Sequence, residues 1–172
     1  MAGGLRDRRA AKLRDQRFGS RYNFGATYRD ARDEAIGRGD RVIGTEHMVL
    51  ALLVDPQSPA ARALGVDLAS ARSALDAMDD RALEAIGVRA AVSAGPITAR
   101  SGGSLRLTPA AKAIFTGIPS ASKDRRDGLG VVLDALLALR RPDPAAELLA
   151  VLGVGRAAVM ARFADCDEEK QG

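Results

Sequence analysis

Three adjacent residues, Thr45, Glu46 and His47, carry side chains that could take part in chemistry or in ligand binding. His47 is the single histidine of the chain and could act as a general base, because an imidazole titrates near neutral pH. The alternative interpretation is a partly buried histidine at the start of a helix. Thr45 can serve as the N-cap of that helix, and Glu46 adds a carboxylate where the helix dipole favours it. A cap stabilises a fold by about 1 kcal/mol and needs no ligand.

Motifs for other kinds of catalysis are missing from the sequence. A phosphate-binding Walker loop needs Gly-Lys-Ser/Thr, and no lysine of this chain follows a glycine. Gly128 and Gly130 lack the third glycine and the preceding strand of a dinucleotide site. One histidine and one cysteine cannot supply a His/Cys metal cluster, and no Gly-x-Ser-x-Gly elbow exists for a serine nucleophile. We therefore expect a non-enzymatic protein with no cofactor and no metal.

The composition predicts an all-helical protein of the cytoplasm. Hydrophobic residues make up 47% of the 172 residues but aromatic residues only 3%, so the core must consist of Ala, Leu, Val and Ile, an alphabet that favours helices. The only cysteine, Cys166, cannot form an intramolecular disulfide, which fits a reducing cytosol. The N-terminal stretch lacks the apolar segment of a signal peptide, and Asp134 interrupts the longest apolar run, so we expect no membrane association.

The positive charge of the chain is concentrated in residues 1–20, which are predicted to form a frayed helix or a disordered arm. Six Arg and Lys residues outnumber two Asp residues there, and this difference equals the whole net charge of +4. The basic arm is either a solvated tail or an element that contacts nucleic acid or an acidic partner, since each phosphate contact adds affinity through counterion release. Without interleaved aromatic residues or a groove-reading helix, nucleic acid is the less favoured partner.

Helix start and stop signals divide the rest of the chain into two similar halves. The first half is predicted to begin with a helix from about residue 26 to Gly37 and Gly39, followed by an apolar helix that residues 43–47 open. A third helix is expected from Ser58-Pro59 to Gly65. Asp67 should cap a fourth helix that runs to about Met78, and a short helical segment is expected over 80–86. In the second half, helices are expected to start at Thr108-Pro109, after Gly128-Leu129-Gly130, at Asp143-Pro144 and after Gly153-Val154-Gly155, the last ending near Phe163.

The two halves also match each other in sequence. Residues 60–66 resemble residues 146–154 at an offset of roughly 88 residues, which indicates an internal repeat. The simplest interpretation is two tandem, pseudo-symmetric four-helix units that form one compact bundle. The expected organisation is a basic arm (1–20), a first repeat (21–86), a linker (87–106), a degenerate second repeat (107–163) and an acidic tail (164–172).

The first half resembles the repeat at the N-terminus of Clp ATPases of the ClpC and ClpA type. The resemblance is carried by Ile43-Gly44-Thr45-Glu46-His47, the apolar helix that follows, Ala60-Ala61 and Leu64-Gly65-Val66-Asp67-Leu68. The second half is similar to the family at residues 107–112 and 152–154. It departs at Val131-Val132-Leu133-Asp134, which match Gly-Thr-Glu-His, and at Pro119, which falls inside the expected first helix of that repeat.

The resemblance implies a helical module that recognises adaptors and unfolded or marked substrates, including arginine-phosphorylated proteins in some members. It marks Thr45, Glu46 and His47 as a candidate phosphoarginine or peptide site, because the matching glutamate of the family takes part in binding phosphoarginine. Helix amides together with a carboxylate suit a ligand that is anionic at the phosphate and cationic at the guanidinium. In the second repeat Leu133 replaces this glutamate, so at most one such pocket is expected.

Aromatic residues near the end of the arm are a second candidate surface. Phe18, Tyr22 and Phe24 are expected to pack the arm onto the body, although in the family aromatic residues near this point can also line the ligand surface.

The expected partners are therefore proteins or peptides: Clp substrates, adaptors or the Clp machinery. No ATPase module follows in this sequence, which suggests a stand-alone version that binds cargo without processing it. The alternative is sequestration of a cyclic-peptide antibiotic or another small molecule, which would protect the ATPase. A regulator that contacts nucleic acid through the basic arm is a third hypothesis. We expect a monomer, because the two repeats can satisfy each other within one chain.

Overall fold

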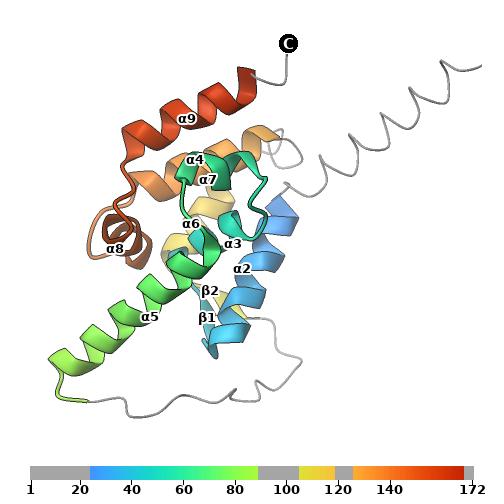
Figure 1. Cartoon of the computed structure of the whole chain (residues 1–172). Coiled ribbons are helices and arrows are strands. Elements are labelled where there is room, and N and C mark those ends of the chain that lie inside the picture. The colour runs from blue at the N-terminus through green and yellow to red at the C-terminus, as the bar shows by residue number, and fades with distance from the viewer. Residues whose placement is uncertain (1–23, 89–104, 119–125, 169–172) are drawn as a thin grey trace, which may run out of the picture.

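The computed structural model describes residues 24–88, 105–118 and 126–168 and shows a helical bundle over these ranges (Figure 1). The described part of the chain contains eight helices and one pair of very short strands, which confirms the predicted all-α class. In chain order these elements are α2 (Phe24–Arg38), β1 (Val42–Ile43), α3 (Thr45–Leu53), α4 (Pro59–Leu64), α5 (Leu68–Ala85), β2 (Arg106–Leu107), α6 (Pro109–Gly117), α7 (Arg126–Ala138), α8 (Pro144–Val151) and α9 (Arg156–Glu168).

Capping residues set the starts of four helices, as the sequence predicts. The side chains that accept a first-turn backbone amide are Ser58 for α4, Asp67 for α5, Thr108 for α6 and Asp143 for α8. A proline follows the cap as the first residue of α4, α6 and α8. Gly65 and Gly153 both adopt a φ of 69° just beyond α4 and α8, a backbone conformation that favours glycine. The two halves thus use the same local signals.

The predicted start of α7 is wrong. Gly128 and Gly130 were expected to precede this helix, but both lie inside it, and neither has a positive φ. The reason for Gly130 is close packing: a Cβ atom at this position would lie 3.0 Å from Cε1 of Phe163 in α9. The glycine therefore lets α9 approach α7 and is not a stop signal.

Two other helices are longer than predicted. α5 runs without a break from Leu68 to Ala85, because no glycine or proline separates the two segments that the sequence suggested. α9 continues past Phe163 to Glu168, so residues 164–168 are helical and do not belong to a tail. Cys166 is buried near the end of α9, which explains why these last turns stay packed on the body.

The core is centred on α3, in which every residue except Glu46 is buried. α3 contacts α2, α4 and α5 from its own half and α6, α7 and α8 from the other half. The two halves are joined as well by the parallel pairing of β1 with β2, in which Ile43 is the register partner of Leu107. Most other core residues are Ala, Leu, Val and Ile, as predicted. The two repeats therefore share one hydrophobic core.

None of the described helices is by itself long and apolar enough to span a membrane. One pair, α8 with α9 up to Cys166, meets that criterion jointly by length and composition, and it is bent by 84°.

Candidate functional site

A cleft of about 240 Å³ lies where the two halves of the chain meet. It is bordered by the C-terminal end of α2, the first turn of α3, the middle of α5 and the start of α8, and it is termed the α2–α5–α8 cleft below. Its lining residues are Arg38, Asp40, Glu46, Leu75, Met78, Asp79, Ala82, Pro142, Pro144 and Glu147. Because Pro142, Pro144 and Glu147 belong to the second half, neither half can form this cleft alone.

His47 is buried next to the lining residue Glu46, and it takes over the capping of α3. The N-cap is Gly44, which has no side chain, and Thr45 is the first helical residue, so the prediction of Thr45 as the N-cap is wrong. The backbone amide of Gly44 donates to Nδ1 of His47 at 3.0 Å, while Nε2 lies 2.9 Å from Oδ2 of Asp40. The ring is 1% exposed. These contacts favour a structural role for His47 over that of a general base.

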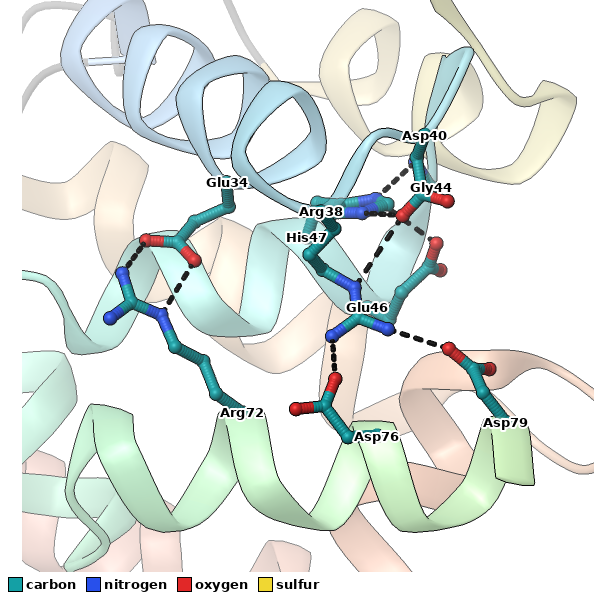
Figure 2. A network of polar contacts seen from close by, with 9 residues as sticks. All are labelled: Glu34, Arg38, Asp40, Gly44, Glu46, His47, Arg72, Asp76 and Asp79. Atoms are coloured by element: carbon teal, nitrogen blue, oxygen red, sulfur yellow. Dashed lines mark hydrogen bonds and ion pairs between the residues drawn. The ribbon is translucent and has the colours of Figure 1, made fainter. Parts of the chain in front are cut away.

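Glu46 is the candidate site residue that faces the cleft. Its carboxylate Oε1 lies 3.0 Å from Nδ1 of His47, and its side chain is 17% exposed (Figure 2). Burial alone would raise the pKa of Glu46, but the contacts with His47, its own backbone amide and Arg38 outweigh burial and lower the pKa. The carboxylate is therefore held in its charged form at the cleft wall.

The protonation state of His47 decides which neighbour its Nδ1 atom binds. Burial alone would lower the pKa of His47, but hydrogen bonds and charge attraction from Glu46 and Asp40 outweigh burial and raise it. A protonated Nδ1 donates to Glu46, whereas a neutral Nδ1 accepts from the Gly44 amide. The His47 proton thus couples the cap of α3 to the Glu46 carboxylate.

Thr45 does not line the cleft; it joins the two halves of the chain. Its hydroxyl donates to Oδ1 of Asp143 at 2.7 Å, and the same oxygen accepts from the backbone amide of Ala145. Thr45 is 1% exposed, which leaves no room for a ligand. Of the three candidate residues, only Glu46 can meet a ligand in the cleft.

Arg38 lines the cleft, and its side chain reaches from α2 to Asp76 and Asp79 of α5 (Figure 2). Its guanidinium donates to Asp76 and, at 2.6 Å, to Oδ2 of Asp79, while Nε lies 3.5 Å from Oδ2 of Asp40. Burial alone would lower the pKa of Arg38, but these carboxylates outweigh burial and raise it further. The pKa of Asp79 is raised, mainly by burial. Arg38 is therefore occupied by α5 and α2 carboxylates.

A second ion pair fixes the position of α5 relative to α2. Glu34, which is 9% exposed, accepts two hydrogen bonds from Arg72: Nε to Oε2 at 2.9 Å and Nη2 to Oε1 at 2.5 Å. Figure 2 shows this pair beside the Arg38 contacts, with Arg72 projecting from α5 towards α2. The forked geometry restrains both side chains. Two arginines therefore connect α5 to α2, and of these only Arg38 lines the cleft.

The charge of the cleft is strongly negative. Four lining carboxylates, those of Asp40, Glu46, Asp79 and Glu147, face a single lining guanidinium, that of Arg38. The other lining residues are apolar and are called the apolar floor below: Leu75, Met78, Ala82, Pro142 and Pro144. The four carboxylates are called the acidic rim. An acidic rim over an apolar floor suits a long cationic side chain, whose aliphatic stem can be buried while its charged head meets carboxylates.

The sequence did not reveal most of these cleft residues. Arg38, Asp40, Asp79 and Glu147 were not predicted, because they come from three separate segments: the end of α2, α5 and α8. The spacing of Asp76 and Asp79 does place both carboxylates on one face of a helix, but only the packing of α5 on α2 shows which cation they meet.

The other predicted sites give a mixed result. Phe18 and Tyr22 lie outside the described residues, and the side chain of Phe24 is not described either, so the aromatic ligand surface stays a prediction. In the second repeat, Leu133 is 1% exposed and belongs to the core. Within the described ranges, no group of three or more His, Cys, Asp and Glu residues is arranged to hold a metal ion.

Comparison with known proteins places this architecture in a family. The family described as the Clp repeat (R) N-terminal domain matches residues 24–152, from the start of α2 to the residue after α8. No curated protein matches the sequence. Domains of this family generally mediate protein interactions in Clp systems. Because the match covers well over half of the chain, this protein belongs to the Clp repeat N-terminal domain family.

Proposed function

We propose that this chain is a non-enzymatic peptide-binding module that receives adaptors or substrates in a Clp system, and that the α2–α5–α8 cleft is its binding site. The observation that carries the proposal is the position of Glu46. This residue is the glutamate of the Gly-Thr-Glu-His string by which the chain resembles its family, and it lines a cleft together with residues of both repeats.

The size of the cleft supports a single side chain as the part of the ligand that enters it. Its volume of about 240 Å³ lies below the roughly 300–1,000 Å³ of pockets that enclose drug-sized molecules. This argues for recognition of a residue within a peptide and against capture of a whole cyclic peptide or other small molecule inside the cleft.

The charges support arginine as the residue that is recognised. A guanidinium can donate in parallel to carboxylates such as Glu46, Asp79 and Glu147, and its stem can lie on the apolar floor. A phosphoryl group on that arginine needs a cation or free amides. Arg38 is already held by Asp76 and Asp79, and the Gly44 amide is used by His47. The cleft therefore favours unmodified arginine over phosphoarginine.

Calorimetric titration with four matched peptides tests this proposal. The peptides differ at one central residue, which is arginine, phosphoarginine, lysine or the neutral isostere citrulline. We expect saturable binding of the arginine peptide, weaker binding of the lysine peptide and no measurable binding of the citrulline peptide. Tighter binding of phosphoarginine than of arginine would instead establish a marked-substrate receptor, and no heat from any peptide would refute the cleft as a receptor.

Two variants and one control connect binding to the cleft. Glu46→Gln and Glu147→Gln each remove one carboxylate, and we expect each to weaken the arginine peptide about 5- to 10-fold, the equivalent of about 1–1.4 kcal/mol. Glu147→Gln leaves the His47 contacts intact, so it separates binding from any effect on the start of α3. Asp165→Asn removes an exposed carboxylate from α9 and should leave the affinity unchanged.

A further inference from the structure

The chain carries two regions of opposite charge. The basic arm, residues 1–20, contains six Arg and Lys residues and two Asp residues, a difference that accounts for the net charge of +4. The α2–α5–α8 cleft carries four carboxylates and one guanidinium. The remaining residues together carry a net charge of +3, because the whole chain has a net charge of +4. Opposite charges on one chain attract each other more effectively than charges on two molecules, because covalent linkage raises the effective concentration of one charged segment at the other.

We propose that the basic arm is an intramolecular ligand of the α2–α5–α8 cleft, which an external peptide must displace. This inference rests on the proposed function, because it assigns an occupant to the same site. It turns the cleft from a permanently open receptor into a site that is partly blocked by its own chain.

The arm is long enough to reach the cleft. It joins the body at Phe24, where α2 begins, and the cleft lies at the other end of α2, at Arg38. A helix of 15 residues is about 22 Å long. Arg14 precedes Phe24 by ten residues, and an extended stretch of that length spans about 33 Å. Arg14 and the cations that precede it can therefore reach the acidic rim.

The composition of the arm matches the cleft. All of its cations except Lys12 are arginines, and the fork of a guanidinium fits carboxylates in pairs. The side chains of Asp79 and Asp40 are 61% and 45% exposed, so their outer edges are open to such a fork. The apolar floor at Leu75 and Met78 can take the stem of the same arginine.

A spin label on the arm tests the contact directly. The full chain carries the label at Ala10→Cys, with Cys166→Ala to remove the native thiol while keeping an apolar side chain. We expect the amide signals of Met78, Ala82 and Glu147 to broaden at low salt and to recover at about 1 M salt, where charges are screened within about 3 Å. Uniform broadening, or broadening that survives high salt, would overturn the proposal.

Matched variants show whether the carboxylates hold the arm. We expect the broadening to disappear in the chain with Asp79→Asn and Glu147→Gln, and to persist with Asp165→Asn as the control. If the double variant keeps the broadening, the arm binds elsewhere and the proposal is wrong.

A competition measurement gives the functional consequence. The six arm cations are replaced by glutamine in the full chain, and the affinity for the arginine peptide is compared with that of the parent. We expect binding to tighten on the order of 3- to 10-fold, because a tethered competitor acts at an effective concentration on the order of millimolar. An unchanged affinity for the arginine peptide would overturn the proposal. The proposal would also be overturned if the only effect of the six replacements were a loss of binding to an added nucleic acid duplex.

The two measurements separate this inference from the proposed function. Label broadening at the cleft without binding of any external peptide supports the intramolecular contact and refutes the receptor role. Equal peptide affinity with and without the arm cations, together with no broadening, refutes the intramolecular contact and leaves the receptor role standing.

Discussion

Arg38→Met should destabilise the protein and yet tighten its binding of an arginine peptide. The two effects have opposite signs because Arg38 plays two roles. It holds α5 against the end of α2 through Asp76 and Asp79, and it is the one cation among the residues that line the cleft. Methionine keeps the apolar volume of the side chain and removes its charge.

The loss of stability follows from the exposure of its partners. The Asp76 and Asp79 side chains are 65% and 61% exposed, and ion pairs in such a setting contribute about 0.2–1 kcal/mol each. The contact with Asp40 at 3.5 Å adds less. We therefore expect a loss of about 1–2 kcal/mol in the free energy of unfolding, or a fall of roughly 2–8 °C in Tm for a chain of this size.

The gain in affinity follows from Coulomb's law. A unit positive charge about 7 Å from a bound cation, screened nearly as in water, opposes binding by about 0.6 kcal/mol. Its removal should tighten the arginine peptide about threefold. Urea denaturation measures the first effect and calorimetric titration the second. Arg72→Met is the matched control, because it breaks the pair with Glu34 outside the cleft lining and should lower stability without changing affinity.

Weaker peptide binding by Arg38→Met would refute this reasoning. It would mean that Arg38 contacts the ligand through an anionic group, and loss of phosphoarginine binding in this variant would identify that group as the phosphoryl. An unchanged free energy of unfolding would show that the contacts between Arg38 and α5 contribute nothing.

Two further predictions concern pH and packing. The pKa of His47 is raised above its ordinary value of about 6.5. Its contribution to the free energy of unfolding is therefore complete below that value and is lost as pH rises through the folded-state pKa. The pKa of Glu46 is lowered, so its contribution to the free energy of unfolding is complete above about 4.5 and is lost as pH falls through the folded-state pKa. Urea midpoints should be highest between these values, and His47→Gln should remove the decline on the alkaline side; an unchanged profile in the variant would contradict the assignment. Gly130→Ala should hardly change the free energy of unfolding of the parent protein, because a helix-propensity gain of about 1 kcal/mol is offset by the 3.0 Å contact between the new Cβ and Phe163. In a Phe163→Leu variant, which lacks this contact, the same substitution should stabilise the protein by about 1 kcal/mol. Equal effects in both backgrounds, measured by thermal unfolding, would show that the ring moves aside freely.

The sequence was most informative where a residue acts on its own neighbours. Ser58 and Asp143 were correctly predicted as caps, because a side chain that accepts an amide three or two residues later needs no distant partner. Glycine was read correctly where it ends a helix, as at Gly65, and wrongly at Gly130. The difference between these two glycines lies in the ring of Phe163, which no local pattern reveals.

The candidate site was predictable only in part for the same reason. The motif that contains Glu46 identified one wall of the cleft. The transfer of the capping role to His47 follows from the absence of a side chain at Gly44, which could have been anticipated. The contact of Arg38 with α5 and the presence of Glu46 and Glu147 in one cleft depend on how helices far apart in the chain pack together. Only the folded structure supplies that information.

The pairing of β1 with β2 has a consequence for how binding competence arises during folding. It joins Ile43 to Leu107, whose positions differ by 64 residues, and contacts across such a separation form slowly because chain entropy is lost before they are made. A nascent chain that ends before Glu147 therefore cannot yet hold a ligand in the cleft. Conversely, a ligand held by both halves stabilises the entire chain, by about 2.7 kcal/mol at a concentration one hundred times its Kd. Occupancy of this one cleft thus requires that synthesis has passed Glu147 and that residues of both halves have come together.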